Sequence, residues 1–173
     1  LWPDPGASIE KRVEVNVYGE TVRATLSMIV HKMVACSLAY QKLFILSPNI
    51  RIEREERAIS GIHAYEFTQF DFEVRNAIFK EITSLVEEII CGLIRSLRKN
   101  MREETIYLGR WDTLKIPKAP FKVYDRRELQ KIFGTSWETR ILFETCDPIW
   151  VTNIPREFYD FEDFETGKWD NYD

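Results

Sequence analysis

Residues 51–73 alternate between chemically active and apolar side chains with a period of two, which predicts two β-strands joined by a charged loop. In the first strand Arg51 and Glu53 point to the same face. In the second strand the face with the chemically active side chains carries His63, Tyr65, Phe67, Gln69, Asp71 and Glu73. The alternate positions are mostly apolar, with Phe70, Phe72 and Val74 among them. The pattern predicts a sheet with one core-facing side and one side that forms the floor of a binding site.

Apolar periodicity along the rest of the chain predicts further elements. A hairpin is expected over residues 13–25, and helical stripes are expected over residues 28–41 and about 76–99. Ser27 lies where the first helix needs an N-cap. A short strand over residues 43–46 is expected to end in a turn at Ser47-Pro48-Asn49.

The second half of the chain has weaker signals. Residues 100–120 are expected to be an irregular connection, and strands are expected at 121–124 and 149–153. Asp125 and Glu128 have the spacing of a capping box, which predicts a short helix that ends at Gly134. The predicted fold class is therefore α+β, an antiparallel β-sheet flanked by helices.

Composition narrows the possible classes of protein. The 173 residues are 45% hydrophobic, which is enough for a single domain with a core, expected over residues 1–173. A net charge of −4 argues against a broad nucleic-acid-binding face. The three cysteines show no metal-ligand spacing and favour a reducing, cytoplasmic location. No apolar run approaches the roughly 20 residues of a membrane span, so no membrane association is expected.

Arg51 is the strongest candidate for chemistry. Its guanidinium fork suits a phosphate, and a strand holds it rigidly, although an Arg-x-Glu pair alone is also common as a surface ion pair. On the same face, Phe67 can stack on a base and Asp71 can receive an ammonium group. Lys32 is either a solvated lysine or a fixed charge for a substrate carboxylate, and His63 is either structural or part of the site.

These residues resemble the second signature motif of class II aminoacyl-tRNA synthetases of the aspartate/asparagine/lysine group. That motif is an Arg-x-Glu strand, a variable loop and a His-x-x-Glu-Phe strand, matched here by residues 51–53 and 63–67. Ser27 and Lys32 are five apart, like the serine and lysine of the aspartate-binding helix. Segments 121–125 and 153–159 are most similar to the archaeal asparagine synthetase that is a paralogue of aspartyl-tRNA synthetase.

The resemblance implies a class II synthetase-like catalytic core that binds ATP and L-aspartate. Arg51 is implied as the catalytic residue, which holds the α-phosphate while the aspartate carboxylate attacks it. The implied ATP-binding residues are Arg51, Glu53, His63 and Phe67. The implied substrate-binding residues are Ser27, Lys32, Gln69 and Asp71.

Some features of the class have no counterpart in these residues. Ile29 and Met33 occupy positions at which aspartyl-tRNA synthetases usually carry glutamine. The glycine-rich third motif, the magnesium-binding acid–serine pair and most of the dimer-forming first motif are not found. We therefore expect the chain to lack its N-terminal and C-terminal portions, the Mg²⁺ ligands to lie outside it, and the complete protein to be a homodimer.

The main functional prediction is an ATP-dependent ligase that forms aspartyl-adenylate and amidates it with ammonia to give asparagine. The acidic charge and the lack of a recognisable anticodon-binding module argue against tRNA as a partner. One alternative is an aspartyl- or asparaginyl-tRNA synthetase, or a fragment of one. The other is a catalytically inactive paralogue that binds a nucleotide, an amino acid or a protein.

Overall fold

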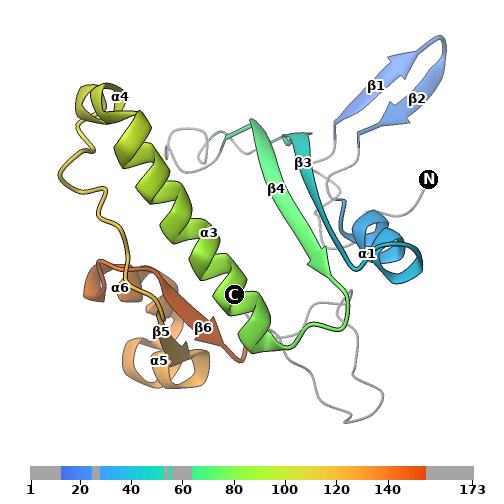
Figure 1. The fold of residues 1–173 in the computed structure, drawn as a ribbon. Helices are drawn as coiled ribbons and strands as arrows, with labels where there is room; N and C mark the ends of the chain where they lie inside the picture. Colours follow the sequence, from blue (N-terminus) through green and yellow to red (C-terminus); the bar gives the residue numbers. More distant parts are fainter. Residues whose placement is uncertain (1–12, 25–27, 53–54, 56–63, 155–173) are drawn as a thin grey trace. The chain divides into compact units, whose positions relative to one another are not determined.

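The structure is a computed structural model that describes residues 13–24, 28–52, 55 and 64–154 (Figure 1). The described residues fall into two compact units, the first ending at Asn76 and the second beginning at Ala77. Strands β1–β4 and helix α1 belong to the first unit, and the remaining helices and strands belong to the second. This mixture of helices and strands confirms the α+β class. The extent of a single domain over residues 1–173 stays a prediction.

The first unit begins with the predicted hairpin. Strands β1 (Glu14–Val17) and β2 (Glu20–Arg23) are antiparallel. The two turn residues, Tyr18 and Gly19, have φ values of 52° and 86°, and a two-residue turn with positive φ matches the twist of the strands. The Asn16 side chain accepts a hydrogen bond from the Gly19 N–H at 3.0 Å, which stabilises the turn.

Helix α1 (Ile29–Leu38) confirms the first predicted helix in shortened form. Met28 occupies the N-cap position without a side-chain cap, and Ser27 lies outside the described residues. The buried residues of α1 are Lys32 and Cys36, which are four apart and so share one face of the helix. The helix contacts both β3 and β4, which brings Lys32 to the neighbouring strand pair.

Strands β3 (Lys42–Ile50) and β4 (Glu66–Val74) form an antiparallel pair (Figure 1). In their register Ser47 lies opposite Gln69. The predicted turn at residues 47–49 is wrong, because β3 continues through Pro48. The Arg51 N–H donates to the Tyr65 carbonyl at 2.8 Å, and hydrogen-bonded pairs alternate along an antiparallel ladder. Pro48 therefore falls where the backbone nitrogen faces away from β4, and its missing N–H removes no bond between the strands.

The β3–β4 pair has two chemically distinct faces, as the alternation predicts. The polar face carries Ser47, Asn49, Phe67, Gln69, Asp71 and Glu73. Arg51 was predicted to lie within a strand, but β3 ends at Ile50, and Arg51 follows directly after it with its guanidinium against Phe67. On the opposite, apolar face the ring centroids of Phe44 and Phe70 lie 5.9 Å apart, and those of Phe70 and Phe72 lie 6.0 Å apart. Phe44 and Phe70 remain exposed, so the predicted packing of this face on a core is not seen within the described residues of the unit.

The second unit is organised on the long helix α3 (Phe79–Asn100), which confirms the helix predicted over about 76–99. At its start the Glu81 carboxylate accepts a hydrogen bond from the Ile78 N–H at 3.0 Å. The next segment, predicted to be irregular, contains a second helix, α4 (Arg102–Tyr107). Arg98 fastens this segment to α3, because its guanidinium donates to the Trp111 and Leu114 carbonyls at 2.9 and 2.7 Å.

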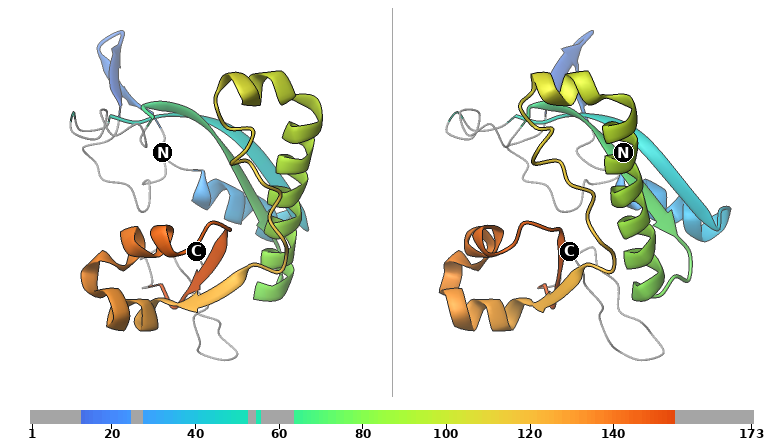
Figure 2. Two further views of the ribbon diagram at one scale, coloured as in Figure 1. Left: turned by 90° about the vertical axis from the view of Figure 1, so that its left-hand side faces the viewer. Right: turned by 60° about the vertical axis from the view of Figure 1, so that its left-hand side comes forward.

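The second unit ends in a parallel strand pair, β5 (Lys122–Asp125) and β6 (Ile149–Thr152). Between them lie α5 (Arg126–Phe133), the 3₁₀ turn η2 (Gly134–Ser136) and α6 (Trp137–Glu144), which form the crossover that a parallel pair needs (Figure 2). The buried core of this region is made by Leu129, Trp137, Ile141 and Val151. The predicted cap and stop of α5 are confirmed by Asp125 and by Gly134, whose φ is 63°.

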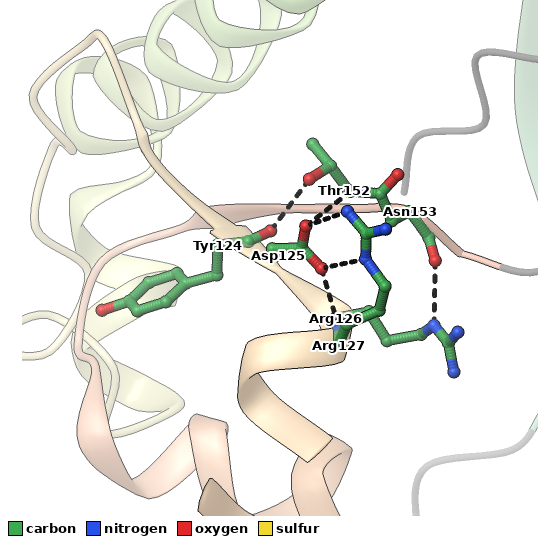
Figure 3. A network of polar contacts seen from close by, with 6 residues as sticks. All are labelled: Tyr124, Asp125, Arg126, Arg127, Thr152 and Asn153. Carbon is green, nitrogen blue, oxygen red and sulfur yellow. Dashed lines mark hydrogen bonds and ion pairs between the residues drawn. The ribbon is translucent and has the colours of Figure 1, made fainter. Parts of the chain in front are cut away.

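Asp125 also ties the ends of β5 and β6 together (Figure 3). Its carboxylate accepts hydrogen bonds from the Arg127 backbone N–H and guanidinium and, at 2.7 Å, from the Asn153 side-chain amide. Arg126 donates from Nε to the Asn153 carbonyl at 2.9 Å. The hydrogen bonds from the Arg127 side chain are the main reason that the pKa of Asp125 lies well below its ordinary value.

Glu87 connects α3 to both strands of the parallel pair. It is only 7% exposed, and its Oε1 accepts hydrogen bonds from the Phe121 N–H, next to β5, and from the Trp150 indole N–H on β6, each at 2.9 Å. One turn further along α3, the thiol of the buried Cys91 contacts the Pro117 carbonyl. The helix therefore holds the segment before β5 through polar contacts.

Candidate functional site

At one end of the polar face, the Lys32 ammonium lies between two carboxylates. Its Nζ is 3.1 Å from Asp71 Oδ1 and 3.3 Å from Glu73 Oε1, and the residue is 4% exposed. Helix α1 supplies the lysine and strand β4 supplies both acids. Burying an ammonium is unfavourable unless it is paired, so these contacts account for its position. Of the two roles considered for Lys32, the solvated lysine is excluded.

A chain of side-chain amides continues from this ion cluster along the polar face. Gln69 donates from Nε2 to Asp71 Oδ1 at 3.1 Å. Asn49 donates from Nδ2 to the Ser47 carbonyl at 2.9 Å and approaches Gln69 Oε1 at 3.4 Å. The sequence interpretation missed Asn49 because it assigned residues 47–49 to a turn. Extending the alternation backwards from Arg51 in steps of two would have found it.

At the other end of the polar face, a cation lies over an aromatic ring. The Arg51 guanidinium carbon is 5.1 Å from the centroid of the Phe67 ring, within the range of a cation–π contact. Phe67 is the register partner of Asn49, so this pair follows directly after the amide chain. A planar cation beside an aromatic ring suits a ligand that combines a phosphate with a flat heterocycle.

The separation of the two ends is set by the strand. Phe67 and Asp71 are four residues apart, which corresponds to about 13 Å along an extended backbone. An elongated ligand with a heterocycle and phosphate at one end and a charged group at the other matches this spacing. Among the described residues of this face, Arg51 and Lys32 place positive charge at both ends, and the acids Asp71 and Glu73 lie beside Lys32.

The structure brings together five of the eight predicted site residues. They are Lys32, Arg51, Phe67, Gln69 and Asp71, and all lie on the polar face or against it. Ser27, Glu53 and His63 lie outside the described residues, so their roles stay predictions. Glu73 was placed on this face by its alternation but was not predicted to contact Lys32.

Two further predictions concern the Mg²⁺ site and the cellular location. No group of three or more His, Cys, Asp or Glu side chains in the described part of the chain is arranged to hold a metal ion. The Mg²⁺ site stays a prediction. Within the same residues, no helix is long and apolar enough to cross a membrane. The cytoplasmic location stays a prediction as well.

Comparison with known proteins identifies the family. A family model described as tRNA synthetases class II (D, K and N) matches residues 10–171, nearly the whole chain. This chain belongs to that family of class II tRNA synthetases. The family is one of ligases, which agrees with the predicted enzyme class in its coarse form.

Similar proteins are consistent with this class II synthetase assignment. The asparagine–tRNA ligase of Malacoplasma penetrans (strain HF-2) is 24% identical over 102 residues, which are 59% of this chain and 22% of that protein. The asparaginyl-tRNA synthetase of Pyrococcus horikoshii, solved with asparaginyl-adenylate, has a TM-score of 0.72 and 21% identity over 94% of this chain. The Entamoeba histolytica asparaginyl-tRNA synthetase has a TM-score of 0.74 and 15% identity over 98%.

These likenesses confirm the predicted class II catalytic fold. This chain covers 41% of the Pyrococcus protein and 43% of the Entamoeba protein, so it spans less than half the length of each. The particular resemblance to an archaeal asparagine synthetase stays a prediction. We expected that tRNA is not a partner. The family is one of tRNA synthetases, so its membership does not support that expectation.

Proposed function

We propose that this chain carries the amino-acid-activating site of an aspartyl- or asparaginyl-tRNA synthetase. In this reaction an amino-acid carboxylate attacks the α-phosphorus of ATP, the bond to the β-phosphate oxygen breaks, and an aminoacyl-adenylate and pyrophosphate form. The observation that carries the proposal is the polar face itself, with Arg51 and Phe67 at one end and Lys32 and Asp71 at the other.

The roles of the residues follow from their positions on this face. Phe67 stacks on adenine, and Arg51 holds the α-phosphate and stabilises the charge that develops on it. Asp71 receives the α-ammonium group of the amino acid. Because all these groups are attached to one strand pair and its helix, they hold the carboxylate and the phosphate in line before reaction. Magnesium, the predicted cofactor, would neutralise charge on the phosphates of ATP.

Lys32 favours aspartate over asparagine as the substrate, although the similar proteins are named for asparagine. The lysine is buried and its partners, Asp71 and Glu73, are partly exposed. A side-chain carboxylate of the substrate can share the ammonium with them, whereas a neutral carboxamide compensates a buried charge less well.

We propose tRNA as the acceptor, because the family is one of tRNA synthetases and the similar proteins form aminoacyl-tRNA by name. Ammonia is the second candidate. It is favoured by segments 121–125 and 153–159, which resemble the asparagine synthetase paralogue. Both acceptors consume the same adenylate, so the described site supports either outcome.

Pyrophosphate exchange into ATP tests the activation step. The assay should use the full-length gene product. We expect exchange that depends on L-aspartate and is much weaker with L-asparagine. The acceptor is then identified by supplying tRNA or ammonium and measuring aspartyl-tRNA or free asparagine. The absence of exchange with either amino acid would contradict the proposal and favour an inactive, binding paralogue.

Variants assign the nucleotide end. Arg51→Gln should lower the exchange rate by about 10²–10³-fold, the scale for loss of one preorganised charge-stabilising group. Phe67→Leu should raise the KM for ATP by roughly 5–100-fold, since base–aromatic stacking contributes about 1–3 kcal/mol. Phe70→Leu, on the opposite face of the same strand, is the matched control and should leave the KM for ATP unchanged.

A further inference from the structure

We infer that Asn49 is a positioning residue that orients the amino-acid-binding end of the site through Gln69. The inference rests on the proposed function, because it concerns how the same site recognises its amino acid. Asn49 does not contact the Lys32 cluster itself. It acts at a distance of two side chains, through the amide of Gln69 and then the carboxylate of Asp71.

The orientation of the Asn49 amide is determined by its backbone contact. A carbonyl oxygen can only accept a hydrogen bond, so the atom 2.9 Å from the Ser47 carbonyl must be the Nδ2 of Asn49. The same Nδ2 lies 3.4 Å from Gln69 Oε1. The Gln69 amide is therefore held with its oxygen toward Asn49 and its nitrogen toward Asp71.

This orientation decides which oxygen of Asp71 is occupied. Gln69 Nε2 and Lys32 Nζ both lie 3.1 Å from Asp71 Oδ1. Both of these donors lie on the Oδ1 side of the carboxylate. We expect an incoming ammonium group to be received by the other oxygen, Oδ2. If the Gln69 amide turned over, its oxygen would face Asp71 Oδ1, and the repulsion between two acceptors would move the carboxylate.

Burial makes the relay difficult to replace. Asn49 is 4% exposed, so water has little access to take over its contact with Gln69. The net contribution of such a hydrogen bond to stability is about 0.5–1.5 kcal/mol, although removing Asn49 alone would also leave its acceptor oxygens without this donor. The contact that connects Asn49 to the amino-acid-binding end is the one with Gln69, so kinetics and stability must both be measured to separate orientation from stabilisation.

A double-mutant cycle in the full-length gene product tests the inference. Asn49→Leu has a similar volume and no donor, and we expect it to raise the KM for L-aspartate in pyrophosphate exchange by about tenfold. The KM for ATP and the kcat should stay unchanged. Gln69→Leu should have a similar effect, and the double variant should be no worse than either single variant, because both break one relay.

Asn49→Asp is the sharper variant. It places a carboxylate oxygen against the Ser47 carbonyl or Gln69 Oε1, so it forces the turned-over amide, and its effect on the KM for L-aspartate should exceed that of Asn49→Leu. Should Asn49→Leu fail to fold, Asn49→Ser gives the same test, since its hydroxyl can remain near the Ser47 carbonyl but is too short to reach Gln69.

Three results would overturn the inference. They are additive effects of the Asn49 and Gln69 substitutions, equal increases in the KM for ATP and for L-aspartate, and a lower melting temperature with unchanged kinetics. Each would assign Asn49 to the fold alone. These results presuppose exchange by the unsubstituted protein. If that protein activates neither L-aspartate nor L-asparagine, the proposed function fails and this inference fails with it. If it activates only L-asparagine, the same KM comparison is made with L-asparagine.

Discussion

Lys32 in the first unit and Glu87 in the second are the two buried charged side chains among the described residues. The carboxylate of Glu87 meets two neutral donors, a backbone N–H and an indole N–H, that are fixed parts of the fold. The ammonium of Lys32 meets two carboxylates, whose side chains are 16% and 29% exposed.

The difference in partners indicates a difference in role. The neutral donors on Glu87 cannot be exchanged without opening the second unit, so this charge is a structural connection between α3 and the β5–β6 pair. The carboxylates of Asp71 and Glu73 beside Lys32 are partly exposed to solvent, so another anion could reach the ammonium group and share it with them. A buried charge with charged, partly accessible partners is therefore the better candidate for ligand binding.

The largest expected effect separates these roles at Lys32. Lys32→Gln should lower aspartate-dependent exchange by on the order of 100-fold or more, because it removes one partner of a buried charge pair. Binding of ATP, measured by calorimetry, should be retained. The matched control is Lys42→Gln, at an exposed lysine on β3, which should leave exchange unchanged. An equal loss in both variants would break the comparison.

The second effect concerns stability and Glu87. Glu87→Ala leaves the buried Phe121 N–H and the partly buried Trp150 indole N–H without this acceptor, at about 1–3 kcal/mol each, so the free energy of unfolding should fall by roughly 2–6 kcal/mol. Chemical denaturation measures this value. Glu88→Ala, at the exposed neighbour on α3, should change it little. If Glu87→Ala instead raised the KM for L-aspartate at full stability, Glu87 would not be purely structural.

The smallest expected effect concerns Asp125, whose carboxylate is partly exposed, in contrast to the buried charges of Lys32 and Glu87. The pKa of Asp125 is lowered in the folded protein, so its contribution to stability is present above the ordinary value of about 3.9 and is lost as the pH falls below it. The stability advantage of the unsubstituted protein over Asp125→Asn should therefore shrink as the pH is lowered from 7 toward 3. Melting temperatures across this range measure it.

Arg127→Leu provides the check on the cause. It removes the main reason for the low pKa of Asp125, so this variant should lose the same acid-dependent component. At neutral pH both substitutions should change stability only slightly, because exposed ion pairs contribute little. An acid-dependent component that persists in either variant would contradict the assignment to this pair.

Local patterns predicted much of the fold and the floor of the site. The period-two alternation found the polar face, and the apolar stripes found α1 and α3. Short elements without a clear stripe were missed, among them α4 and α6. The parallel pairing of β5 and β6 depends on a crossover, which no local signal in either strand specifies.

The site was predicted residue by residue but not as a set of contacts. Lys32 and Asp71 were each expected to meet a substrate group, and the structure pairs them with each other across α1 and β4. Such pairing between distant segments depends on tertiary packing rather than on spacing in the sequence. Asn49 was missed for a local reason, since Pro48 beside it is a strong turn signal.

Pro48 has a further consequence for the correct assembly of this strand pair. Shifting β3 against β4 by one residue would move the proline to a position where the ladder needs an N–H, and one interstrand bond would be lost. The same shift would turn over the side chains of β3, so that Phe44 and Leu46 rather than Ser47 and Asn49 would lie on the face of Gln69 and Asp71. Pro48 therefore disfavours this slip relative to the observed register, in which Asn49 lies on the same face as Gln69.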